Sequence, residues 1–332
     1  MNQYNNITLE HGAGGQKSNE LIGEIRKILK VKEGWNNAED DAAFFKFTPL
    51  IKGARGIVFT TDAFIVDPIF FPGGDIGKIA ICGTINDLAV MGAKPIGIAL
   101  SIVMEEGFPL EDLKKIMQSI NKVSKETGVP IVTGDTKVTE KGKMDKIEIT
   151  TSGVGLAEKI IDNGGTRSGD VVISSGDLGK HAVALLSSRF NYKTKIKSDC
   201  QPLVKEIQAV SKYLTSCKDP TRGGVAAVLN EMAEKSKTKF ILDESKLPFK
   251  KETIALSELL GIDKFAFPSE GRFVATCSSK NAATVIKLLK KFNKEAKIIG
   301  SIKRGKGVWL KTRLGGLKLI ETPRGKLIPR IC

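Results

Sequence analysis

The chain has 332 residues, of which 41% are hydrophobic and 27% charged, and its formal net charge is +15. This length exceeds that of most single domains and predicts two hydrophobic cores of ordinary size. The composition excludes a disordered or fibrous protein, and no apolar stretch is long enough to span a membrane. The N-terminus has neither a basic leader nor an apolar run, so we expect no secretory signal and a cytoplasmic protein.

Hydrophobic periodicity predicts helices that alternate with strands along the chain. We expect helices at 18–30, 75–91, 109–127, 201–214, 222–235 and 280–292, with Ser18 and Asp75 as N-caps. We expect strands at 57–61, 96–104, 130–133, 147–156, 170–175, 239–242, 272–277, 296–302 and 307–311. This alternation predicts an α/β or α+β fold. The glycine-rich segment 162–169 predicts domains at 1–160 and 161–320, followed by a mobile tail at 321–332.

Basic side chains are concentrated in the last third of the chain. Residues 1–234 contain 29 basic and 29 acidic side chains, whereas residues 235–332 contain 23 and 8. The lysines are interspersed with apolar residues, as in Val285–Lys291, which is typical of a solvated helix face. We therefore favour a solvated lysine-rich surface over a docking face for an acidic protein, and either over a nucleic-acid site. No nucleic-acid or membrane partner is expected.

Cysteine and histidine usage limits the metal chemistry. The five cysteines show no CxxC spacing, which argues against a disulfide framework and a thiolate zinc site. The two histidines, His11 and His181, are too few for histidine-rich metal sites. Any metal must therefore be bound by carboxylates.

Five acidic motifs lie where strands or helices meet glycine-rich turns, at 39–43, 60–62, 84–88, 134–137 and 219–224. Asp62 and Asp135 each follow an apolar strand, where α/β proteins place ligands. Converging carboxylates suit Mg²⁺, which usually brings a phosphate with it. Each aspartate alone is more typical of a turn or a cap, but together they favour a nucleotide and metal site.

A glycine-rich loop precedes the first predicted helix. It runs from His11 to Lys17 and contains Gly12, Gly14 and Gly15. Such a loop, a helix N-terminus and a lysine suit phosphate oxygens, although the loop lacks the GxxxxGK[ST] pattern of a P-loop. The similar segment 71–77 is equally well explained as a structural turn.

The chain ends on Cys332. A thiol on the last residue is a handle for covalent chemistry, unless it is an accident of a frayed terminus. Prenylation is excluded because that signal has three residues after the cysteine. If extended, residues 321–332 could span on the order of 40 Å, so the thiol could reach a distant site.

Taken together, these motifs resemble the HypE family of hydrogenase maturation factors, of the superfamily that contains aminoimidazole ribonucleotide synthetase, selenophosphate synthetase and thiamine-monophosphate kinase. The resemblance extends from His11–Gly15 through the acidic motifs to Pro329–Cys332, and the terminal Pro-Arg-Ile-Cys is the part specific to HypE. It implies a two-domain aminoimidazole ribonucleotide synthetase-like fold. It also implies a homodimer whose N-terminal sheets pair across the interface, with ATP and Mg²⁺ bound near it.

The resemblance also implies a reaction. The carbamoyltransferase HypF places a carbamoyl group on Cys332, and the chain uses ATP to dehydrate it to a thiocyanate. The cyanide group is then passed to iron on the HypC–HypD scaffold.

The family motifs carry site roles onto this sequence. They imply catalytic roles for Cys332, for Glu270 as the base, and for Lys137 beside the carbamoyl group. They imply metal ligation by Asp41, Asp62, Asp87 and Asp219. The cofactor-binding residues they imply are Gly12, Gly14, Gly15, Lys17, Asp41, Asp62, Asn86, Asp87 and Asp135. The family often has Asp-His-Gly where this chain reads 176–182, so we assign His181 no role.

Two other functions are considered. One is an ATP-dependent kinase or synthetase of the same superfamily that acts on a free small molecule, with Cys332 incidental. The other is a binding or scaffold protein without turnover.

Overall fold

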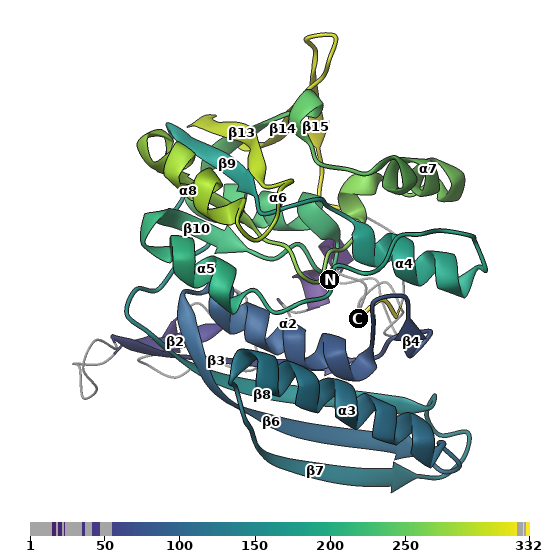
Figure 1. Ribbon diagram of the computed structural model, residues 1–332. Helices are drawn as coiled ribbons and strands as arrows, with labels where there is room; N and C mark the ends of the chain where they lie inside the picture. Colours follow the sequence, from purple (N-terminus) through teal and green to yellow (C-terminus); the bar gives the residue numbers. More distant parts are fainter. Residues whose placement is uncertain are drawn as a thin grey trace.

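The structure is a computed structural model that describes residues 15–17, 19–21, 23, 35–36, 42–46, 55–323, 328 and 330–332. Its strands form a six-stranded sheet, a seven-stranded sheet and a small two-stranded sheet. The two large sheets lie at opposite ends of the molecule, and helix α2 lies between them (Figure 1). The predicted mixture of helices and strands is confirmed. None of the helices in the described ranges is long and apolar enough to cross a membrane.

The six-stranded sheet is built from the N-terminal half of the chain. In spatial order it contains β1 (Trp35–Asn36), β2 (Ala43–Lys46), β3 (Gly56–Phe64), β8 (Ile147–Ala157), β6 (Ala93–Glu105) and β7 (Ile131–Thr139). Only β6 and β7 pair in parallel, and helix α3 (Leu110–Thr127) connects them. Strand β7 therefore forms one edge of the sheet.

Helix α2 (Ile76–Val90) is buried on nearly all sides. It begins at the predicted N-cap Asp75, whose carboxylate accepts hydrogen bonds from the backbone N–H groups of Gly77 and Lys78. Gly77 lets α3 approach closely, because a Cβ at this position would lie 2.7 Å from the Ile116 carbonyl oxygen. A helix that is apolar all round belongs between layers, and α2 contacts both β3 and α5.

The seven-stranded sheet is built from the C-terminal half. In spatial order it contains β10 (Leu214–Lys218), β12 (Val274–Ser278), β9 (Asp170–Ser174), β13 (Lys297–Arg304), β11 (Thr238–Asp243), β14 (Gly307–Lys311) and β15 (Leu317–Ile320). The helices of this half are α4 (Lys180–Arg189), α5 (Val204–Val210), α6 (Gly224–Ser236), α7 (Lys251–Leu260) and α8 (Ala282–Leu289). The small sheet pairs β4 (Phe70–Phe71) with β5 (Gly74–Asp75).

Several element predictions differ from the structure. The helix predicted at 201–214 is the shorter α5, and residue 214 already begins β10. Strand β7 continues to Thr139, six residues beyond the prediction. Helices α4 and α7 were not predicted. In α4, seven consecutive residues are buried, so its sequence lacks the alternation of apolar and polar residues that indicates a helix. Of the helix predicted at 18–30, residues 19–21 and 23 are helical, and Ser18 lies outside the described residues.

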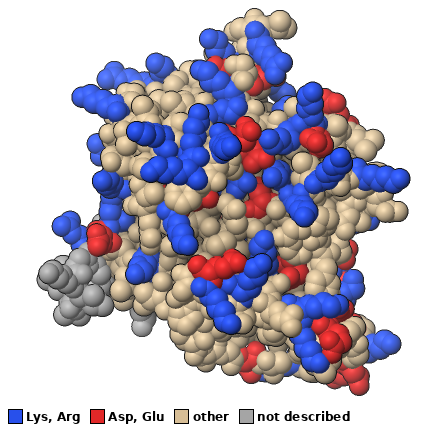
Figure 2. Space-filling view, viewed as in Figure 1, with Lys and Arg blue, Asp and Glu red and all other residues tan. Residues whose placement is uncertain are grey.

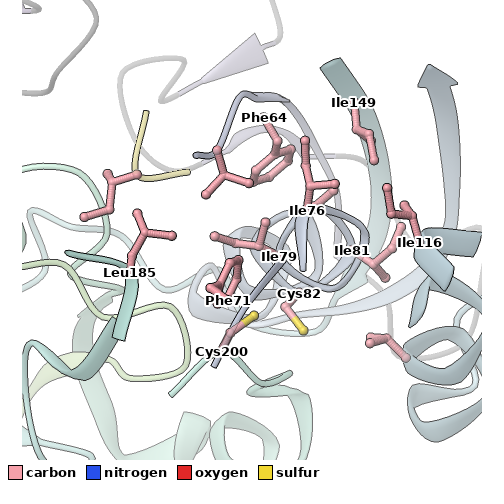
Figure 3. Close-up of a cluster of buried hydrophobic side chains, with 14 of the residues drawn as sticks. Phe64, Phe71, Ile76, Ile79, Ile81, Cys82, Ile116, Ile149, Leu185 and Cys200 are labelled. Carbon is pink, nitrogen blue, oxygen red and sulfur yellow. The ribbon is translucent and has the colours of Figure 1, made fainter. Parts of the chain in front are cut away.

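The largest hydrophobic cluster joins the two halves of the molecule. Isoleucines and Cys82 from α2 pack near Phe64 of β3 and Leu185 of α4 (Figure 3). The same cluster includes the buried tail residues Ile328 and Ile331, and Cys332 packs against it. The end of the chain is therefore part of a core in this structure.

The basic surface has the form of a solvated face. On α8, Val285 and Leu289 are buried, whereas Lys287 and Lys290 are exposed. On the face drawn in Figure 2, lysine and arginine side chains are spread over the C-terminal half with uncharged surface between them.

Candidate functional site

The end of the chain is docked between the two halves of the molecule. The backbone N–H groups of Ile65 and Asp67 donate to the carbonyl oxygens of Cys332 and Arg330, at 3.3 and 3.1 Å. The tail therefore runs antiparallel to the segment that follows β3, as an added strand would. Ile331 is only 5% exposed, so its side chain anchors the last turn of chain. The mobility predicted for residues 321–332 stays a prediction.

Charged groups surround the docked thiol of Cys332. Burial and the negative charges of Glu270, Asp62 and Asp219 together raise its pKa to about 12, and Arg222 opposes this rise. A thiol in this position stays protonated at neutral pH and is a poor nucleophile. The docked position thus suits a thiol that already carries a group better than one that must attack.

Glu270 is the most unusual acid beside the thiol. Its side chain is 2% exposed, and its Oε1 makes no hydrogen bond to the part of the chain that the structure describes. Burial raises its pKa well above the ordinary value, and Cys200, Asp219 and Asp199 add to the rise. A buried carboxyl group with one oxygen outside any hydrogen bond and a strongly shifted pKa is a candidate for proton transfer.

Asp62 and Asp87 form a pair of neighbouring carboxylates. The hydroxyl of Thr84 donates to Asp62 at 2.9 Å, and that of Thr60 donates to Asp87 at 3.0 Å. Burial raises the pKa of Asp62, while the hydrogen bond from Thr84, the charge of Arg222 and a hydrogen bond with Asp87 lower it. Two carboxylates held together at a part-buried position fit a divalent cation that also binds phosphate oxygens.

The structure describes three of the four predicted metal ligands, Asp62, Asp87 and Asp219, and does not gather these three into one metal-binding cluster. Among the residues that the structure describes, no three His, Cys, Asp or Glu side chains are close enough to hold a metal ion. Asp219 is buried and faces Cys332 and Glu270, so its ligation of the same metal stays a prediction. Asp41 lies outside the described residues. Asp62 and Asp87 therefore fit the metal best.

Arg222 is a site residue that the sequence analysis did not assign. Its pKa is raised, first by the charge that Cys332 would carry as a thiolate and then by the charges of Asp62, Asp87 and Glu270. Because the thiol is protonated at neutral pH, the carboxylates are the effective partners there. The signal was an arginine inside the acidic motif 219–224, and it could have been weighed as a counter-charge.

Asn86 connects helix α2 to the backbone around Glu270. Its amide nitrogen donates to the carbonyl oxygens of Gln201 and Glu270, at 3.1 and 3.2 Å, and its amide oxygen accepts from the Leu203 N–H at 2.8 Å. The side chain therefore links α2 to the second half of the molecule and fixes the backbone of Glu270. Cofactor binding by Asn86 stays a prediction.

The remaining predicted residues lie elsewhere or are not described. Asp135 and Lys137 are exposed on the edge strand β7 and are not brought to Cys332 by any described contact. Gly15 is buried with φ of 100°, and the next residue, Gln16, donates its N–H to the Pro323 carbonyl at 3.4 Å. Lys17 is half-buried. Gly12 and Gly14 lie outside the described residues.

Comparison with known proteins gives close relatives over nearly the whole chain. Residues 39–157 match the N-terminal domain of AIR synthase related proteins, and residues 167–311 match their C-terminal domain. A carbamoyl dehydratase HypE of Cupriavidus necator is 42% identical over 337 residues, which cover 98% of this chain and 95% of that protein.

Two solved structures are similar in fold and sequence. One is a HypE–HypF complex, with a TM-score of 0.84, 39% identity and coverage of 91% of this chain and 99% of that one. The other is a hydrogenase maturation protein HypE in complex with ATP, with a TM-score of 0.81, 30% identity and coverage of 98% and 100%.

Proposed function

The chain belongs to the HypE family of carbamoyl dehydratases, within the AIR synthase related proteins, and on this premise we propose that it dehydrates an S-carbamoyl group on its own Cys332 to a thiocyanate with ATP. The product would supply the cyanide ligand for hydrogenase iron. The observation that carries the proposal is the docking of Cys332 beside Glu270 and Arg222.

The reaction removes one oxygen and two nitrogen-bound hydrogens from the carbamoyl group. ATP, when bound, would supply the phosphoryl group that lets this oxygen leave as phosphate, and Mg²⁺ would neutralise the charge on the phosphates. Asp62 and Asp87 are the residues that would hold Mg²⁺. Glu270 would accept one of the two protons from the amide nitrogen, and the other would leave with the phosphate; the raised pKa of Glu270 makes its ionised carboxylate a stronger base.

Arg222 and the buried surroundings complete the chemistry. The guanidinium offsets the negative charge of Asp62, Asp87 and Glu270 near the reacting group. The cluster of isoleucines around the tail, against which the partly buried Cys332 packs, would limit the access of water to the thiocyanate. Binding, orientation and exclusion of water are thus all supplied by groups around the docked tail.

Transfer to and from the tail requires other proteins in this proposal. HypF would load the carbamoyl group, and the HypC–HypD scaffold would receive the cyanide. The similar HypE–HypF complex supports HypF as a partner. Because docking raises the pKa of the thiol to about 12, loading suits an undocked tail, in line with the mobile tail predicted at 321–332. None of the five cysteines, all of which the structure describes, forms a disulfide, which suits the reducing cytoplasm.

The proposal includes a homodimer formed through the N-terminal sheets. Strand β7 lies at the end of its sheet and exposes Val132 and Val138 to 63% and 66%. Exposed apolar residues on an edge strand favour pairing with a second strand. Such pairing would cover the edge that carries Lys137 and Asp135, and would bring both residues into contact with the second chain.

Intact-mass spectrometry tests the proposal directly. The full chain is incubated with HypF and carbamoyl phosphate, and ATP is added in a second step. We expect carbamoylation of the last peptide, followed by ATP-dependent loss of one water. Replacing Cys332 by Ser should abolish both changes. An unmodified Cys332 with active HypF would overturn the proposal, and turnover of a small molecule by the Cys332→Ser variant would favour the kinase or synthetase alternative.

A further inference from the structure

We propose that His181 and Arg189, at the two ends of helix α4, are positioning residues that hold the tail in its docked position by binding its main-chain carbonyl groups. The proposal goes beyond the proposed function, because it concerns how the tail is held and not what reaction follows. His181 was assigned no role from the sequence, and in the structure its ring is hydrogen-bonded to the tail.

His181 binds the residue before the terminal cysteine. Its Nε2 lies 2.7 Å from the carbonyl oxygen of Ile331, and its Nδ1 lies 2.8 Å from the hydroxyl of Ser198. A carbonyl oxygen only accepts, so Nε2 carries the proton and Nδ1 accepts from the Ser198 hydroxyl. The Cys200 N–H in turn donates to Ser198 at 3.1 Å, which fixes the orientation of the hydroxyl.

The surroundings of His181 keep this arrangement rigid. The ring is completely buried and packs edge-on against Phe71, with centroids 5.3 Å apart. Burial lowers its pKa, while the hydrogen bond to Ile331 and the charge of Asp199 oppose that shift. A neutral ring with one fixed tautomer can only donate to the tail, so it recognises a carbonyl group at this position.

Arg189 binds the next carbonyl group along the tail. Its Nη2 donates to the Arg330 carbonyl at 2.9 Å, and its Nε donates to the Asp67 carbonyl at 2.9 Å. The Asp67 N–H also donates to the Arg330 carbonyl. One guanidinium therefore joins the tail to the segment after β3, and two donors converge on a single tail carbonyl.

The side chain of Arg330 adds a weaker contact. Its guanidinium lies 2.5 Å from the carboxylate of Asp145, but both side chains are partly exposed, so this pair contributes little. Arg330 also has a φ of 52°, a left-handed conformation that is strained for a residue other than glycine. Contacts to the main chain must offset that strain; Arg189 binds the carbonyl group of the strained residue itself, and His181 binds that of the next residue.

The test measures how fast iodoacetamide alkylates Cys332 in the full chain, without ATP or HypF, by mass spectrometry of the tail peptide. Removing one donor should open the tail and raise the rate about tenfold in His181→Phe and in Arg189→Met. His181→Gln, which keeps a donor, should return the rate toward that of the wild type. Arg167→Met replaces an exposed arginine in the same half of the molecule and should change nothing.

The four buried cysteines serve as an internal control for folding. Cys82, Cys200, Cys217 and Cys277 should stay unlabelled in every variant. If they label in His181→Phe, the half-buried Arg189 decides the question through Arg189→Met alone. The proposal is overturned if Cys332 in Arg189→Met labels at the wild-type rate, or if His181→Gln labels as fast as a folded His181→Phe.

The outcome is independent of the proposed reaction. If dehydration fails in the wild type, the alkylation rates still decide whether the two residues hold the tail. If dehydration succeeds, both variants should accept the carbamoyl group normally but lose water about tenfold more slowly. Equal slowing of both steps would contradict a role in positioning.

Discussion

The site around Cys332 and the edge strand β7 differ in how many of their neighbouring groups come from this one chain. At the Cys332 site, Glu270 is 2% exposed and its backbone is fixed by Asn86 and Asp199. On β7, seven consecutive residues are exposed, among them Asp135 and Lys137. The Cys332 site is therefore organised before any ligand binds, whereas the side chains on β7 need a second protein surface before they can form a site.

The same comparison explains where charge is tuned. Burial raises the pKa of Glu270, of Asp62 and of Cys332, and Arg222 opposes each of these shifts. Such effects need a low local dielectric, which the hydrophobic cluster around α2 and the tail provides. Three experiments test this contrast between a preorganised site at Cys332 and an exposed edge strand β7.

The largest effect is expected for Glu270→Gln. This change keeps the shape of the side chain but removes the proton acceptor, so ATP-dependent loss of water should fall about 100- to 10,000-fold. Carbamoylation of Cys332 should be unaffected, because it does not use Glu270. Intact-mass time courses measure both steps. Glu258→Gln, on the exposed face of α7, is the matched control. An unchanged dehydration rate in Glu270→Gln would show that Glu270 is not the base.

The parts of the site that could be predicted from sequence are those with local signals. The cap at Asp75, helix α2 and the acidic motifs each follow from residue type and spacing within a few positions. Glu270 and Cys332 followed from the family resemblance. His181 and Arg189 could not be found in this way, because their partners Ile331 and Arg330 lie more than a hundred residues away and are contacted through main-chain atoms.

Local signals also misjudged elements whose environment overrides periodicity. Seven consecutive residues of α4, starting at His181, are buried, so its sequence has no polar stripe to reveal a helix. Residues 211–214 continue the apolar pattern of α5, yet Leu214 begins β10 because the strand pairs with β12. Tertiary contacts decided both cases.

A smaller effect on stability is expected for Glu206→Gln in the wall of the second domain. Burial raises the pKa of Glu206 from 4.5 to about 7, while Arg272 opposes the shift. Between these values the folded state binds more protons than the unfolded chain, so the free energy of unfolding falls as pH rises. Above pH 7 this loss amounts to about 3 kcal/mol, and the glutamine variant avoids it.

Urea unfolding at pH 4 and pH 8 measures this linkage. The variant should match the wild type at pH 4 and exceed it at pH 8, because glutamine keeps the acceptor for Gln201 without a charge. Glu252→Gln, on an exposed surface of α7, should show no such gain. Equal stability of wild type and Glu206→Gln at both pH values would mean that Glu206 is more exposed to water than the structure indicates.

The smallest effect is expected at the edge strand, from Val138→Lys. If β7 pairs with its counterpart in a second chain, a lysine here adds a charge beside Lys137 and should weaken the dimer on the order of tenfold. Leu259→Lys is a close control, because Leu259 is also 66% exposed but lies on α7, far from the edge in sequence and in Figure 1. Sedimentation equilibrium over a range of concentrations gives both dissociation constants. Dimers that respond equally to the two changes, or a monomeric wild type, would leave β7 without a partner strand, and Lys137 would then have to reach the carbamoyl group by movement of its own chain.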